Sequence, residues 1–271
     1  MSVFLKDLRY ALRQLNKARG FALTCVLTLA LGIGANTAVF SVLNAVLLKS
    51  LPVAEADRVV YLNTSGAPRR AGTIFSRETF SYPVYESLRE HHPGLSEVIA
   101  SVPLSTSKVA VRIGAMPEEA EGDMVSGNFF SGLGVNLVRG RGFNQQDEDA
   151  HAPVAVISHN YWTRRFSQSP DVLGKAFYVN GVPLTIVGVS AESFEGVEPG
   201  NSTDFWIPLQ NRAELNAWGH PLEEGENYRT NPTWWCLRLL GRLAPGHEWS
   251  FPSASMATSM LNAGPVPSLT R

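Results

Sequence analysis

The chain has 271 residues, a formal net charge of −1 and 44% hydrophobic residues. This balance excludes a disordered chain and a basic nucleic-acid-binding protein, and the length allows one membrane anchor and a domain with a sizeable core. Of the two cysteines, Cys25 lies in an apolar run and Cys236 far downstream, so neither an internal disulfide nor a cysteine metal site is expected.

Residues 1–19 have the pattern of an amphipathic helix. The apolar face carries Phe4, Leu5, Leu8, Leu12 and Leu15, and the basic residues are Lys6, Arg9, Arg13, Lys17 and Arg19. A helix of this kind directly before an apolar run is expected to lie in the membrane interface, although ordinary core helices share the pattern. The five basic residues against a single Asp7 predict a cytoplasmic amino terminus.

Residues 20–48 contain no charged side chain and predict a transmembrane helix, with the most apolar part at Phe21–Leu43. A secretory signal peptide is the alternative, but its apolar region is shorter. Small residues recur along one face of the predicted helix, at Ala30, Gly34, Ala38, Ser41 and Ala45. Such a face allows close packing against another helix, while Gly and Ala are also common in membrane helices for no such reason.

Residues 49–246 alternate short apolar runs with turn residues, which predicts a mixed α+β domain outside the cytoplasm. The predicted strands are Arg58–Leu62, Ser107–Ile113, Pro153–Ile157, Lys175–Asn180, Pro183–Val189, Asp204–Leu209 and Trp234–Leu243. Asn180-Gly181 predicts a type I′ hairpin turn. Helices are expected after Ser81, Ser126 and Ser158 as N-caps.

The remaining segment, residues 247–271, combines four Pro and Gly residues with serines and predicts a divergent, disordered tail. The sequence contains no complete nucleotide-binding, zinc-binding or nucleophile motif. Gly174-Lys175 lacks the rest of a phosphate loop, His247-Glu248 lacks the second histidine of a zinc helix, and Ser190 lacks the second glycine of a nucleophile elbow. Asp147-Glu148-Asp149 is interpreted as a solvated loop. No catalytic, cofactor-binding or metal site is predicted.

Over about nine tenths of its length the chain resembles MacB/FtsX-type ABC transporter permeases, in particular the duplicated permeases with a MacB-like periplasmic core domain. The most specific matches are Asp7–Leu15 and Leu27–Ser41. Others are Phe80–Pro83, Val125–Phe130, Gly140-Arg141, Pro153–Ser158, Trp162, Arg165, Phe166, Leu173-Gly174, Asn180-Gly181, Ile186–Val189, Asp204–Leu209 and Gly241–Leu243. These are turn glycines, caps and core aromatics, so they indicate a fold and not a reaction.

The resemblance implies a single-pass protein of the bacterial inner membrane with a periplasmic domain that acts in mechanical coupling or export. It also implies a separate ABC ATPase and further permease membrane helices as partners, besides the lipid bilayer, and no nucleic acid. Family members continue into further membrane helices, so we interpret residues 247–271 as a foreign tail on a truncated permease.

Two other functions are compatible with the sequence. The first is an autonomous anchored periplasmic domain that binds a ligand or a protein. The second is an enzyme assembled from scattered residues such as His159, Asp204 and His220, which no motif supports. Recovery of an ATPase together with the chain would favour the permease component over both.

Overall fold

The computed structural model describes Tyr10, Arg13, Leu215, Arg229 and residues 17–47, 51–63, 79–91, 94–104, 108–198, 200–212 and 235–246. The chain separates into two compact units, Met1–Lys49 and Ser50–Arg271. The predicted interfacial helix falls mainly outside the described residues, of which Tyr10, Arg13 and Lys17 are helical. The predicted tail lies wholly outside them.

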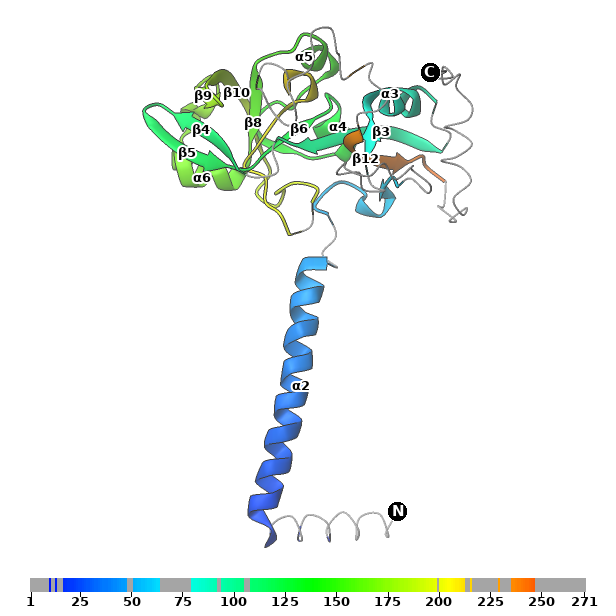
Figure 1. Cartoon of the computed structure of the whole chain (residues 1–271), viewed down its shortest axis with the longest axis vertical. Coiled ribbons are helices and arrows are strands. Elements are labelled where there is room, and N and C mark those ends of the chain that lie inside the picture. The colour runs from blue at the N-terminus through cyan, green and yellow to red at the C-terminus, as the bar shows by residue number, and fades with distance from the viewer. Residues whose placement is uncertain are drawn as a thin grey trace, which may run out of the picture. The chain divides into compact units, whose positions relative to one another are not determined.

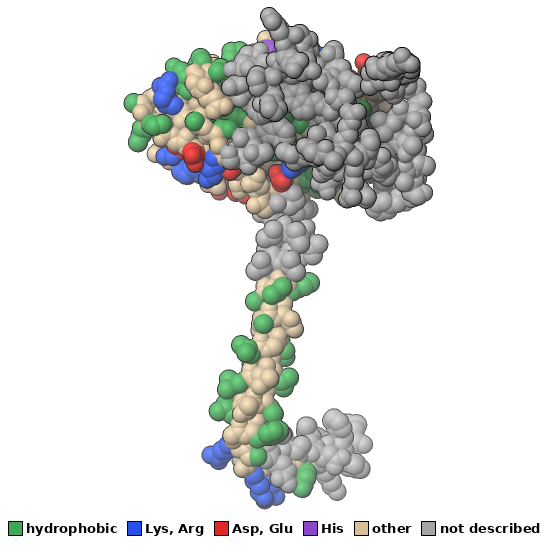
Figure 2. Space-filling model, viewed as in Figure 1, with side chains coloured by type: hydrophobic (Ala, Val, Ile, Leu, Met, Phe, Trp, Pro, Cys, Tyr) green, Lys and Arg blue, Asp and Glu red, His purple; other side chains and the backbone are tan. Residues whose placement is uncertain are grey.

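The first unit contains the long helix α2, Arg19–Leu47 (Figure 1). Its segment Arg19–Ser41 is long and apolar enough to cross a membrane, with a mean hydropathy of 1.8, and none of it is buried within the protein. Figure 2 shows hydrophobic side chains around this helix and basic ones at its N-terminal end. The hydroxyls of Thr24, Thr28 and Thr37 donate to carbonyl oxygens one turn earlier, which suits an apolar surrounding.

The second unit is built on a mixed sheet in the order β1-β12-β3-β6-β11-β8-β10-β9-β4-β5, with β2 beside β12 and β7 beside β10. The pairs β10/β8 and β11/β6 are parallel and the other pairs are antiparallel. The strands are β1 Val59–Tyr61, β2 Phe80–Ser81, β3 Leu95–Pro103, β4 Val109–Ile113, β5 Met116–Ala120, β6 Gly122–Val125, β7 Leu137–Gly140, β8 Val154–Ile157, β9 Ala176–Val179, β10 Val182–Ser190, β11 Phe205–Pro208 and β12 Trp235–Leu243.

Helices and short turns cover both faces of this sheet. They are α3 Tyr82–Glu90, α4 Phe129–Leu133, α5 Gln145–Asp149 and α6 His159–Phe166, with 3₁₀ turns η1 Ala56–Arg58, η2 Pro170–Val172 and η3 Leu209–Arg212. Successive residues of β11 enter opposite cores. Phe205 and Ile207 pack in the larger cluster with aromatic residues of α3 and α6, while Trp206 packs with α4. A strand buried on both faces carries apolar residues continuously, as β11 does.

The prediction of an α+β fold is confirmed, and all seven predicted strands are present within one or two residues where the structure describes them. The hairpin between β9 and β10 also forms as predicted. Asn180 and Gly181 have φ angles of 49° and 86°, and Val179 pairs with Val182, which defines a two-residue type I′ loop. Strands β2, β3, β5, β6 and β7 were not predicted.

The three predicted helices are present as α3, α4 and α6, and Ser81 and Ser158 occupy the predicted N-cap positions, whereas Ser126 does not. Ser158 accepts a hydrogen bond of 3.1 Å from the Tyr161 amide at the start of α6. Ser81 precedes α3, but its hydroxyl makes no capping bond and is buried. Ser126 does not cap α4, since the helix begins at Phe129 and the Ser126 hydroxyl accepts from the Ala100 amide instead.

Candidate functional site

Residues 51–58, here called the connector, are the first described residues after helix α2, and hydrogen bonds hold them to the rest of the second unit. The Ala54 amide donates to the Leu133 carbonyl oxygen at 3.2 Å, and Val53 packs against the smaller core cluster. Gly134 ends α4 with a φ of +64°, and a Cβ there would lie 2.5 Å from the Ala54 Cβ. A glycine is therefore required at position 134 for both the turn and the close approach.

Arg242 of β12 fastens the connector from the sheet side. Its Nη1 donates to the Ala54 carbonyl oxygen at 2.8 Å and its Nε to the Gly132 carbonyl oxygen at 2.7 Å. The residue is only 9% exposed. Backbone carbonyl groups satisfy two donors of this buried guanidinium, and Glu55 lies 3.7 Å away. We call Arg242 and these two carbonyl groups the Arg242 clamp.

The connector also reaches back to β12. The Arg58 guanidinium donates through Nε and Nη2 to the Leu243 carbonyl oxygen and through Nη1 to the Glu55 carboxylate. Directly after Arg58, strand β1 pairs with β12, with Val59 opposite Arg242. Side-chain bonds in both directions and a strand ladder thus join the connector to β12, which in turn pairs with the long strand β3. The connector is therefore joined through β12 to the strands of the sheet.

The acidic run 147–149 is not the solvated loop that its sequence suggested. It forms α5, in which Asp147 is 8% exposed and Glu148 is fully buried. Asp147 completes a capping box with Asn144 and binds both Nη atoms of Arg141, at 2.5 and 2.9 Å. The Arg141 hydrogen bonds hold the pKa of the Asp147 carboxyl below its usual value.

Glu148 is the centre of a buried polar cluster. It accepts from the Gly127 amide at 2.6 Å and from the Tyr82 hydroxyl at 3.3 Å, and Gln210 donates to the same hydroxyl at 2.8 Å. Burial raises the pKa of the Glu148 carboxyl, against the lowering effect of the Gly127 N–H group. The cluster ties α5, α3 and η3 to the turn before α4, so its role is to hold elements in place.

Among the described residues, the others considered in the sequence have structural partners. Ser190 is the buried last residue of β10, not a loop serine, and its hydroxyl donates to the Phe194 carbonyl oxygen. Asp204 accepts from Arg164 at 2.9 Å and from the Glu121 amide at 3.1 Å, while the His159 ring packs on Trp162. His220 and His247 lie outside the described residues. Among the described residues, no group of three or more His, Cys, Asp and Glu could hold a metal.

Two polar pairs involve strands β6 and β12. Thr203 donates to the Asp123 carboxylate of β6 at 2.9 Å, and Arg238 of β12 pairs with Glu198 at 2.7 Å. Burial raises the pKa of Asp123 to about 6. Neither Asp123 nor Arg238 stood out in the sequence, because single charged residues inside strands carry no spacing signal.

The described residues thus form an α+β domain that follows a helix of membrane-spanning length, which is the architecture of a membrane-anchored domain. Within that class, the family model of the MacB-like periplasmic core domain matches residues 22–246. The chain belongs to this family, and the resemblance to MacB/FtsX-type permeases drawn from its sequence is confirmed. The apolar helix and the periplasmic-type domain fit an inner-membrane protein.

Individual relatives agree with this assignment. The chain is 29% identical over 154 residues to the probable export ATP-binding/permease protein MacB of Pseudomonas entomophila, covering 57% of the chain and 22% of that protein. It is 34% identical over 110 residues to the macrolide export ATP-binding/permease protein MacB 1/2 of Paracoccus denitrificans, covering 40% and 16%. The chain thus corresponds to a small part of each relative's length.

The fold itself has a solved counterpart. The periplasmic region of MacB from Actinobacillus actinomycetemcomitans aligns with a TM-score of 0.51 at 15% identity, covering 75% of this chain and 80% of that one. At this identity the likeness extends to the fold alone.

Proposed function

We propose that the chain is a component of a MacB-type ABC permease in which the periplasmic core domain is coupled mechanically to the membrane helix. In this function the domain catalyses no reaction. The observation that carries the proposal is the Arg242 clamp, because it fixes the connector to β12, the strand next to β1 at one end of the sheet.

The small number of residues between helix α2 and the connector supports this coupling. Helix α2 ends at Leu47 and the connector begins at residue 51, so three residues separate the helix from the connector. A flexible linker of many residues would absorb a helix movement, whereas so short a link passes most of it on. The buried guanidinium and the β1/β12 ladder then distribute the displacement over the sheet.

The energy for such movement comes, in this proposal, from an ABC ATPase outside this chain. The relatives are named export ATP-binding/permease proteins, which supports an ATP-hydrolysing partner or region. Additional permease helices would pack on the small-residue face of α2 formed by Ala30, Gly34, Ala38, Ser41 and Ala45. A single helix cannot enclose a polar path through a bilayer, so partners are needed for transport.

We infer a cytoplasmic amino terminus and a periplasmic domain from the basic residues before α2. The separation of residues 1–19, 20–48, 49–246 and 247–271 into an interfacial helix, a span, a core domain and a tail belongs to the same proposal. Alkaline phosphatase fused after Leu209 should be active. An inactive phosphatase there, with an active cytoplasmic reporter, would reverse the orientation.

Co-purification tests the permease function against the autonomous ligand-binding alternative, which the cavity described below supports. The tagged full chain is extracted from the native membrane and its partners are identified by mass spectrometry. The proposal predicts an ABC ATPase and polytopic permease segments in amounts comparable to the chain. Recovery of the chain without any ABC ATPase, under conditions that retain a known ABC complex, would contradict it.

A further inference from the structure

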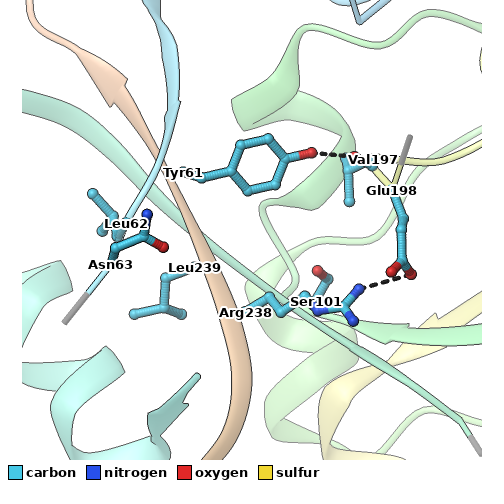
Figure 3. A pocket seen from close by; sticks show the side chains of 8 residues that line it. All are labelled: Tyr61, Leu62, Asn63, Ser101, Val197, Glu198, Arg238 and Leu239. Atoms are coloured by element: carbon cyan, nitrogen blue, oxygen red, sulfur yellow. Dashed lines mark hydrogen bonds and ion pairs between the residues drawn. The ribbon is translucent and has the colours of Figure 1, made fainter. Parts of the chain in front are cut away.

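A cavity of about 350 Å³ opens beside β12 and is independent of the Arg242 clamp (Figure 3). Strands β1, β3 and β12 and the segment after β10 contribute its walls. The lining residues are Tyr61, Leu62, Asn63, Ser101, Val197, Glu198, Arg238 and Leu239. This volume lies at the lower end of the range that holds small organic ligands.

One part of the wall is built for an anion. Arg238 and Ser101 lie directly opposite each other in the β12/β3 ladder, and Figure 3 shows their side chains close together. Ser101 is only 4% exposed, and its hydroxyl makes no hydrogen bond with the residues that the structure describes. A hydroxyl that lines a cavity and has no protein partner can bind a ligand or a water molecule there. Both donors stand on paired strands, which fixes their spacing.

The Glu198 carboxylate of the chain itself pairs with Arg238 in this structure. Glu198 Oε2 lies 2.7 Å from Arg238 Nη1, and the two side chains are 39% and 35% exposed. Ion pairs with this exposure contribute little to stability, so an external carboxylate can compete for the guanidinium. Glu198 stands on the segment after β10, outside the strands, and the Tyr61 hydroxyl holds the neighbouring Val197 carbonyl oxygen. Glu198 can therefore move away while Val197 stays in place.

The apolar side chains on the same side of β12 as Arg238 are the ring of Tyr61 and Val197, whereas Leu62 and Leu239 lie on the other side of the strand (Figure 3). A ligand that fits both parts carries one anionic group and a short hydrocarbon chain. A planar carboxylate matches the fork of Arg238 and can also accept from Ser101.

We propose that this cavity binds a small amphipathic carboxylate, whose anionic group replaces Glu198 on Arg238 and accepts from Ser101 while its hydrocarbon chain lies on the ring of Tyr61 and on Val197. Glu198 acts as an internal competitor that occupies the guanidinium in the absence of ligand. Removal of the Glu198 charge should strengthen binding, and removal of either donor should weaken it.

The test uses the full chain in lipid nanodiscs, with empty nanodiscs as the blank for partitioning. Hexanoate is the probe, 1-hexanol is the uncharged comparator, and saturation-transfer NMR with titration gives the Kd. We expect saturable hexanoate binding, at least tenfold weaker 1-hexanol binding, a three- to tenfold weaker Kd in Ser101→Ala and a threefold or greater tightening in Glu198→Gln. Arg139→Met, which removes an exposed arginine of β7, should leave the Kd unchanged.

Ser101→Ala is a small change, so its fold is checked by circular dichroism before titration, and Glu198→Gln alters only a partly exposed side chain. The proposal fails if hexanoate does not saturate, or if 1-hexanol binds equally well. It also fails if the Kd is the same in the wild type, Ser101→Ala and Glu198→Gln. Arg238→Met should abolish binding; if that variant does not fold, the other two variants decide.

Discussion

The Nη1 atom of Arg242 lies 2.8 Å from the carbonyl oxygen of Ala54, a residue 188 positions earlier in the chain. This bond joins the beginning of the periplasmic core domain to one of its last strands. The same guanidinium holds the Gly132 carbonyl oxygen near the end of α4, so one side chain fixes three segments that are remote in sequence.

Replacement of Arg242 by Met should therefore destabilise the domain strongly. The substitution keeps an unbranched chain but leaves two carbonyl groups without their charged donor, and we expect a loss of about 3 kcal/mol in unfolding free energy. Urea unfolding followed by tryptophan fluorescence measures it in the full chain. Arg238→Met is the matched control on the same strand, with an expected loss below about 1 kcal/mol because its ion pair is partly exposed.

The acidic run 147–149 offers a comparison within one helix. Glu148→Ala leaves the Gly127 amide without its acceptor in a buried position, which should cost about 3 kcal/mol. Asp149→Ala removes an exposed carboxylate whose one hydrogen-bond donor among the described residues is Gln145, with an expected cost below about 0.5 kcal/mol. Thermal unfolding of the two variants distinguishes them, and equal effects would contradict the buried role of Glu148.

Asp123 predicts a specific pH dependence. Its pKa is about 6 in the folded protein against 3.8 for a free side chain, so the folded state binds this proton more tightly. The resulting stabilisation is complete below about pH 4 and is lost as the pH rises through 6. Asp123→Asn keeps an acceptor for Thr203 but removes the titration.

Between pH 4 and 7.5 the wild type should lose about 2 kcal/mol of stability relative to Asp123→Asn, a value reduced for partial solvent access. Parallel urea unfolding at the two pH values gives the difference. Contributions from other carboxyl groups cancel in the comparison. A constant difference across this range would mean that Asp123 titrates alike in the folded and unfolded chain.

The small-residue face of α2 yields a prediction for the membrane. In an α-helix, Ala30, Gly34, Ala38, Ser41 and Ala45 lie within about 80° of arc. The Gly34→Leu/Ala38→Leu variant should insert normally but associate less with partner helices. Co-purification yield measures association, and Leu31→Ala/Val39→Ala is the control on other positions of the helix. If the Gly34→Leu/Ala38→Leu variant co-purifies with partner helices in the same yield as the wild type, the small-residue face has no role in helix packing.

The sequence predicted those parts of the fold that depend on local chemistry. The long apolar helix α2 follows from a run without charges, the β9–β10 turn from Asn180-Gly181, and the start of α6 from the Ser158 cap. These features need only neighbouring residues. Strand β3 was missed because Ser96, Glu97 and a final Pro103 interrupt its apolar pattern, and long-range pairing with β12 and β6 supplies the stabilisation.

The polar clusters were less predictable than the fold, because their members come together only through contacts between segments that are distant in the sequence. The acidic run appeared solvated because its partners, Arg141 and the Gly127 amide, are recognised only when α5 folds against the turn before α4. Arg242 belongs to a segment that matched the family, but its acceptors are backbone carbonyl groups, which no residue pattern reveals. Ser101 and Arg238 become neighbours only through strand register.

The most direct test of the proposed mechanical coupling is hydrogen exchange measured by mass spectrometry on the chain assembled in nanodiscs with the ABC ATPase that the proposal predicts as its partner. ATP turnover should change amide exchange in β12 and α4 of the wild type and of Arg238→Met. In Arg242→Lys, which keeps the charge but offers a single ammonium group in place of the fork, that change should be greatly reduced while ATP hydrolysis continues. Undiminished ATP-dependent exchange in Arg242→Lys, or none in the wild type, would contradict coupling through the Arg242 clamp.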